Sequence, residues 1–125
     1  LSSLLLGGPL EIERNGRIAG MADGAAIDAG CDHSLPDFAA LVACCDAVVT
    51  ADTLAMHLAI AAKKPVVVLM GPTCEAEIEL YGRGTKITSD APCAPCYRAT
   101  CDKGHVCMED ISAAQVFASL EEHLK

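Results

Sequence analysis

The sequence has almost no aromatic side chains and few basic ones. Its 125 residues include two tyrosines, two phenylalanines and no tryptophan, so the core must consist of alanine, valine, leucine and isoleucine. Modules that bind single-stranded nucleic acid stack bases on aromatic side chains, and this chain has few to offer. The net charge of −8, from 17 acidic and nine basic residues, also disfavours contact with a phosphate backbone. We therefore expect no nucleic acid among the partners.

Long apolar runs are missing too, although the mean hydropathy is +0.35 and 52% of the residues are hydrophobic. No run approaches the roughly 20 residues that a membrane-spanning helix needs, and no signal peptide is visible. We expect no transmembrane segment. The length suits one domain. Because the chain begins at Leu1 and enters a strand-like run almost at once, we interpret it as part of a longer protein.

Strand-like and helix-like segments alternate along the chain. Short strands are predicted at residues 3–6, 25–28, 47–50, 65–70 and 85–88, and the fourth is apolar throughout, as in a strand buried on both faces. Helices are predicted over about 10–23, 35–45, 54–62 and 112–124, with a short acidic helix at 75–79. Ser34 with Asp37, and Ser112 with Gln115, are typical capping pairs. The pattern predicts a doubly wound, Rossmann-like α/β domain with a parallel sheet.

Polar residues follow two of these strands where each strand ends. Asp52 and Thr53 come after the third strand, with Met56 and His57 in the helix that follows, and Gly71-Pro72-Thr73 comes after the fourth. Ligands of open parallel sheets bind outside the carboxyl ends of the strands. Free N–H groups and the positive dipole end of a helix favour an anion there, so a diphosphate is the expected ligand.

Each of these residues also has a purely structural interpretation. Asp52 or Thr53 could simply cap the helix, and His57 could be a core histidine. Gly71-Pro72-Thr73 could be only a turn before a helix. The charge of Asp52 repels phosphate, so its carboxylate suits sugar hydroxyls or backbone N–H groups better.

Four blocks of sequence together resemble glycosyltransferase family 9, the heptosyltransferases. They are residues 48–59 (VVTADTLAMHLA), 65–73 (PVVVLMGPT), 5–11 (LLGGPLE) and 34–41 (SLPDFAAL). Members of this family have two Rossmann-like domains that face a cleft, the GT-B arrangement. They transfer heptose from ADP-heptose to the inner core of lipopolysaccharide without a metal. The chain is similar to their C-terminal half, which implies that residues 1–125 form a single nucleotide-sugar-binding domain.

The resemblance also implies a donor site. Asp52, Thr53 and His57 would hold the sugar and the diphosphate, with Met56 beside them. Elsewhere, Glu11 would reach the ribose, His33 and Ser34 would border the adenine, and Gly71, Pro72 and Thr73 would shape the floor of the cleft. Leu54 stands where many members have glycine. The larger side chain would alter or narrow the space where the diphosphate binds. Another nucleotide sugar therefore stays an alternative as the donor.

The same resemblance places the catalytic general base and most of the acceptor site in the N-terminal domain. The first strand and helix of the donor domain, with phosphate-binding Thr and Lys residues, are also expected outside this chain. We therefore expect no catalytic residue here, no turnover by this chain alone and weak donor binding. The lipopolysaccharide acceptor would bind through the other domain, and the enzyme would lie in the cytoplasm, peripheral to the inner membrane.

Four of the eight cysteines lie within residues 93–107, which we call the Cys-rich segment. Cys93, Cys96, Cys101 and Cys107 are separated by two, four and five residues. Four thiolates can hold zinc or an iron–sulfur cluster, although the second pair is less regular than a typical metal knuckle. Disulfides and free thiols are the other interpretations. The alternative function is therefore a non-catalytic α/β module with a structural zinc or iron–sulfur site in this segment.

Overall fold

The computed structural model describes all residues from 1 to 125, and the chain divides into two compact units, Leu1–Leu41 and Val42–Lys125. Both units contain parallel strands alternating with helices, which confirms the predicted α/β class. The strands form two sheets, whereas the alternation along the sequence predicts a single one.

The first unit is a small β-α-β arrangement. Strand β1 (Ser3–Leu5) lies parallel to β2 (Ala26–Asp28), and between them come the 3₁₀ helix η1 (Pro9–Glu11) and the helix α1 (Ile12–Met21). At Gly7, an added Cβ would lie 2.8 Å from Cβ of Glu11 and 2.9 Å from Nδ2 of Asn15. The end of β1 therefore approaches the start of the helical segment so closely that only glycine fits.

Helix α2 (Leu35–Cys44) begins in the first unit with the predicted cap. The Ser34 hydroxyl accepts a hydrogen bond from the Asp37 N–H at 3.3 Å and donates one to the Asp37 carboxylate at 2.6 Å. Ser34 thus satisfies an N–H group that the first helical turn leaves without a backbone acceptor.

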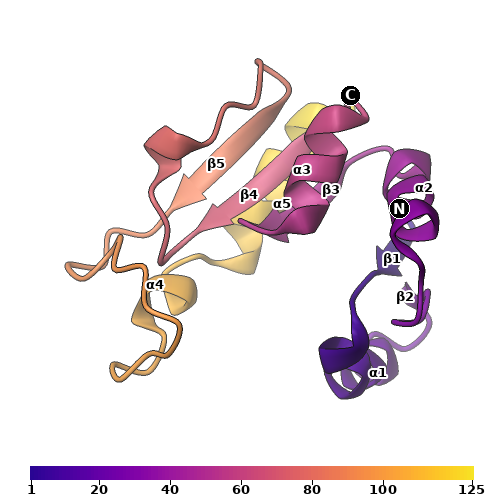
Figure 1. Cartoon of the computed structure of the whole chain (residues 1–125), viewed down its shortest axis with the longest axis horizontal. Coiled ribbons are helices and arrows are strands. Elements are labelled where there is room, and N and C mark those ends of the chain that lie inside the picture. The colour runs from indigo at the N-terminus through magenta and orange to yellow at the C-terminus, as the bar shows by residue number, and fades with distance from the viewer. The chain divides into compact units, whose positions relative to one another are not determined.

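The second unit is built around a three-stranded parallel sheet of order β3-β4-β5 (Figure 1). Its elements are β3 (Val48–Ala51), α3 (Leu54–Ala61), β4 (Val66–Met70), the 3₁₀ helix η2 (Glu75–Glu77), β5 (Gly84–Thr88), α4 (Val106–Glu109) and α5 (Ala113–His123). Val48 pairs with Val66, and Val66 pairs with Gly84. An added Cβ at Gly84 would overlap the carbonyl oxygen of Val66, so this pairing requires glycine.

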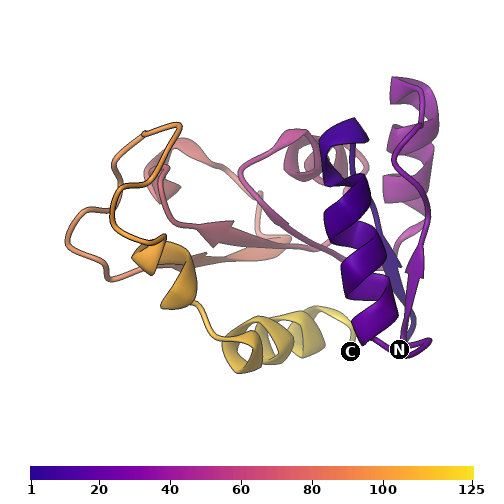
Figure 2. The same ribbon diagram turned by 90° about the horizontal axis from the view of Figure 1, so that it is seen from below.

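The core of the second unit lies on both faces of β4. Helix α3 packs on β3 and β4, and α5 packs on β4 and β5 from the opposite face (Figure 2). Val66, Val67 and Val68 are consequently at most 1% exposed, which confirms the prediction of a strand buried on both sides. None of the helices is long and apolar enough to cross a bilayer.

Candidate functional site

The predicted site residues of the second unit lie at one edge of its sheet. Ala51, the last residue of β3, pairs with Leu69 of β4, and β4 ends one residue later at Met70. The two strands are parallel, so both continue past their carboxyl ends at the same edge of the sheet. Asp52 and Thr53 therefore leave the sheet beside Gly71 and Pro72, as the sequence pattern predicts.

The start of α3 carries polar groups that have no partner in the protein. Thr53 occupies the N-cap position in an extended conformation, but its side chain makes no capping bond. Its hydroxyl instead pairs with that of Thr50 at 2.9 Å. The Met56 and His57 N–H groups donate to the Thr53 carbonyl at 3.1 and 3.4 Å. The Leu54 and Ala55 N–H groups precede this first helical bond and have no acceptor, as is usual at a helix start.

Asp52 and His57 flank these free N–H groups. Asp52 is half-buried and its carboxylate has no hydrogen bond or ion pair, so it does not act as a helix cap. His57 is exposed and its ring is likewise without a partner, which excludes the interpretation as a core histidine. An anionic acceptor of hydrogen bonds, a histidine and two N–H donors are thus available together to a ligand at this helix start.

Met56 differs from its neighbours in burial. The family resemblance places it beside the sugar and diphosphate, but its side chain is fully buried, with 0% exposure. Neighbouring residues of a helix point about 100° apart, so a helix that turns His57 outward turns Met56 into the core. The Met56 side chain therefore contributes to the packing of α3, and its place in the donor site stays a prediction.

The segment after β4 forms the other part of this edge. Gly71 is buried, and an added Cβ would lie 2.7 Å from Sδ of Met108 and 3.0 Å from Sγ of Cys107. Pro72 and Thr73 are half-buried. The Pro72 carbonyl accepts hydrogen bonds from the Cys96 and Tyr97 N–H groups at 3.0 and 2.9 Å. The Cys-rich segment thus contacts the predicted floor of the cleft, a contact that no local sequence pattern indicates.

Glu11, His33 and Ser34 belong to the first unit, where each already makes a local hydrogen bond. Oε2 of Glu11 accepts from the Gly8 N–H at 2.8 Å, and Nε2 of His33 lies 2.8 Å from the carbonyl of Ala29, to which it donates. Ser34 caps α2. Their roles near a ribose and an adenine stay predictions.

A polar residue that sequence reasoning missed lies in the same unit. Asn15 is 3% exposed, and its Nδ2 lies 3.7 Å from Sγ of the buried Cys31. In the sequence, Asn15 is simply a polar residue within the helix predicted at residues 10–23, and nothing in the pattern indicates that it is buried.

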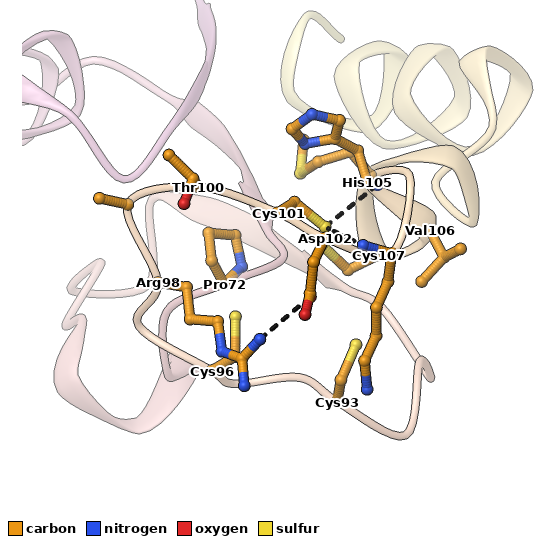
Figure 3. Close-up of a pocket in the computed structure, with 13 residues that line it drawn as sticks. Pro72, Cys93, Cys96, Arg98, Thr100, Cys101, Asp102, His105, Val106 and Cys107 are labelled. Atoms are coloured by element: carbon orange, nitrogen blue, oxygen red, sulfur yellow. Dashed lines mark hydrogen bonds and ion pairs between the residues drawn. The ribbon is translucent and has the colours of Figure 1, made fainter.

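The Cys-rich segment surrounds a cavity of about 280 Å³ (Figure 3). All four of its cysteines line the cavity together with Pro72. The Sγ atom of Cys101 accepts hydrogen bonds from the Lys103 and His105 N–H groups at 3.4 and 3.2 Å. On the exposed side, Arg98 and Asp102 form an ion pair of 3.0 Å.

The arrangement of these thiols bears on the predicted metal site. None of the eight cysteines of the chain is in a disulfide, and no three histidine, cysteine or acidic side chains are grouped as ligands of a metal ion. As they are arranged, Cys93, Cys96, Cys101 and Cys107 line a common cavity but do not fit zinc or an iron–sulfur cluster.

Comparison with known proteins gives consistent results. The sequence model of glycosyltransferase family 9 (heptosyltransferase) matches residues 4–107. Lipopolysaccharide heptosyltransferase 1 of Pseudomonas aeruginosa is 40% identical over 96 residues, which are 76% of this chain and 26% of that protein. Lipooligosaccharide heptosyltransferase 2 of Campylobacter jejuni is 32% identical over 87 residues, 67% of this chain and 27% of that protein. The chain thus spans about a quarter of the length of these relatives.

A solved structure shows the same fold. The E. coli ADP-heptose LPS heptosyltransferase II superimposes with a TM-score of 0.78 over 98% of this chain and 36% of that one, at 23% sequence identity.

Proposed function

The chain belongs to glycosyltransferase family 9, the heptosyltransferase family, and from this premise we propose that it forms the donor-binding part of an enzyme that transfers heptose from ADP-heptose to the inner core of lipopolysaccharide. One observation carries the proposal. At the start of α3, the N–H groups of Leu54 and Ala55 have no acceptor, and the side chains of Asp52 and His57 have no partner. This edge offers what a sugar diphosphate needs.

These groups suit the two parts of such a donor, the diphosphate and the sugar. A diphosphate accepts hydrogen bonds from the free N–H groups, and the positive end of the α3 dipole adds about 0.3–1 kcal/mol. The Asp52 carboxylate repels phosphate but accepts hydrogen bonds from sugar hydroxyls. His57 lies one turn into the helix and donates to a phosphate or sugar oxygen. The same groups would stabilise the ADP that leaves during transfer.

The remaining parts of the proposal concern the whole enzyme. The general base that activates the acceptor hydroxyl and the lipopolysaccharide site would lie in the other domain of the family's two-domain arrangement. Transfer would take place in the cytoplasm, at the inner face of the membrane that carries the acceptor. The exposed Leu54 side chain at the diphosphate seat is the feature that favours the alternative, a related nucleotide sugar. A non-catalytic metal module gains no support from the arrangement of the thiols.

Calorimetric titration of this chain with ADP, UDP, GDP and ADP-heptose tests the proposal. We expect binding of ADP and ADP-heptose, with UDP and GDP much weaker. His57→Ala should weaken both adenine ligands. Asp52→Ala should weaken ADP-heptose severalfold but should not weaken ADP, because the carboxylate is assigned to the sugar and repels the diphosphate.

Asp90→Ala is the matched control, since it removes an exposed carboxylate elsewhere in the same unit and should change neither affinity. Tighter binding of UDP or GDP than of ADP would still support a diphosphate site but would show that the donor is not ADP-heptose. Binding that is unaffected by both Asp52→Ala and His57→Ala would place the ligand elsewhere. A chain that binds none of the four ligands would contradict the proposal.

A further inference from the structure

The segment from Gly71 to Cys74 connects β4 to η2 and has no regular structure of its own. Its backbone therefore cannot be held by a helix or sheet ladder and must be fixed by contacts from other parts of the chain. Figure 1 shows the Cys-rich segment, in orange, beyond the carboxyl ends of β4 and β5, where these contacts arise. The two segments are far apart in sequence, so only the fold brings them together.

Tyr97 holds this segment on both sides of Thr73. Its own N–H donates to the Pro72 carbonyl at 2.9 Å, beside that of Cys96 at 3.0 Å. Its hydroxyl oxygen accepts a hydrogen bond from the Cys74 N–H at 3.0 Å. The backbone of Tyr97 is left-handed, with φ of 54°, which a non-glycine residue keeps only where its surroundings impose it.

The Tyr97 hydroxyl keeps its proton while it accepts from the Cys74 N–H. Desolvation raises its pKa above the usual value, and the Glu77 carboxylate raises it further, while the Cys74 N–H lowers it. Lys86 fixes the stretch that follows, since its Nζ donates to the carbonyls of Glu75 and Ile78 at 2.9 and 2.8 Å.

The opposite end of the Cys-rich segment covers Gly71. Met108 and Cys107 lie so close to this glycine that a Cβ would meet both of their sulfur atoms. The Gly71–Cys74 stretch is thus contacted by the Cys-rich segment and the start of α4 at both of its ends, with Thr73 between the two contacts.

We propose that Tyr97 is a positioning residue for donor binding: by holding Pro72 and Cys74 it fixes Thr73 beside the Asp52–Thr53 connection at the edge of the sheet. This inference rests on the proposed function, because it assigns a task to the segment only if a nucleotide diphosphate binds at that edge. It gives the Cys-rich segment a role that needs no metal, disulfide or redox reaction.

The test compares Tyr97→Phe with Tyr81→Phe in the same chain. Tyr81 is an exposed tyrosine of the second unit whose ring lies 5.6 Å from the Arg83 guanidinium and whose hydroxyl has no hydrogen-bond partner, so its loss is the matched control. Three quantities are measured for each variant: the amide hydrogen-exchange rate of Cys74 by NMR, the affinity for ADP by calorimetry, and the urea midpoint of unfolding.

Tyr97→Phe removes the only acceptor of the Cys74 N–H, so its exchange should accelerate at least about tenfold. The ADP affinity should fall about threefold to tenfold, the range that loss of one hydrogen bond produces. The urea midpoint should stay close to that of the wild-type chain, because the bond lies in a surface segment. Tyr81→Phe should change none of the three quantities.

Each contrary outcome has a distinct meaning. Faster exchange at Cys74 with unchanged ADP affinity would make Tyr97 a structural residue and overturn its role in donor binding. Unchanged exchange would show that the hydroxyl does not hold the segment. If the wild-type chain fails to bind ADP, the proposed function fails and this role fails with it, while the exchange rate of Cys74 still reports separately on the hydrogen bond.

Discussion

Replacement of Gly84 by alanine tests the close pairing of β4 with β5. Gly84 lies opposite Val66 in the β4–β5 pair. An added Cβ would overlap the Val66 carbonyl oxygen and lie 3.1 Å from both Cδ1 of Leu80 and Cγ1 of Val66. The overlapped atom belongs to the backbone of the central strand, so it cannot rotate away as a side chain would.

The size of the effect follows from this geometry. Overpacking of a core costs about 1–3 kcal/mol, and a clash with backbone belongs at the upper end, so we expect Gly84→Ala to lower the free energy of unfolding by about 3 kcal/mol. Gly82→Ala is the control. Its φ of 70° strains an alanine, but nothing lies within 4 Å of the new Cβ, so it should cost only about 1–2 kcal/mol.

Urea unfolding followed by far-UV circular dichroism measures both variants. With a urea dependence of about 1–3 kcal/mol per molar, Gly84→Ala should shift the midpoint by about 1 M or more and should exceed the shift of Gly82→Ala. A Gly84→Ala chain as stable as Gly82→Ala, or more stable, would refute the close β4–β5 pairing.

Two further predictions concern the C-terminal part of the chain. Ser112→Ala should lower the free energy of unfolding by about 1 kcal/mol, because the Ser112 hydroxyl accepts from the Gln115 N–H at 3.2 Å while the Gln115 side chain accepts from the Ser112 N–H at 2.9 Å. Ser119→Ala in the same helix should change it by less than about 0.5 kcal/mol, and equal effects of the two would argue against the capping pair. A metal chelator should leave the melting temperature of the reduced protein unchanged, because the thiols of the Cys-rich segment are not arranged as ligands; a marked drop would show that they hold a metal in solution.

The elements with a strong local pattern could be predicted from the sequence. The uninterrupted apolar run of β4 implies burial on two faces, and the capping pairs at Ser34 and Ser112 place the starts of α2 and α5. Periodicity shows which face of a helix is apolar but not what covers that face. Phe117, one of the apolar residues of α5, is accordingly 52% exposed. Helix α4 has only four residues, too few for any periodic signal.

The position of the candidate site in the fold could be predicted from the sequence. Parallel strands end at one edge, so the order of strands and helices along the sequence is enough to place Asp52, Thr53 and the Gly71–Thr73 stretch together. The orientation of Met56 and His57 could not be predicted, because both follow the same strand and only the packing of α3 decides which one faces the core. The hydrogen bond between Cys74 and Tyr97 spans 23 residues of the chain, and no local pattern reports it.

An NMR titration of the isotope-labelled chain with ADP tests directly whether a nucleotide binds at the start of α3. We expect the amide resonances of Leu54 and Ala55, whose N–H groups are free at the start of α3, to shift most strongly and to saturate together. Shifts confined to residues away from the carboxyl ends of β3 and β4, with these two amides unmoved, would contradict a nucleotide site at this edge of the sheet.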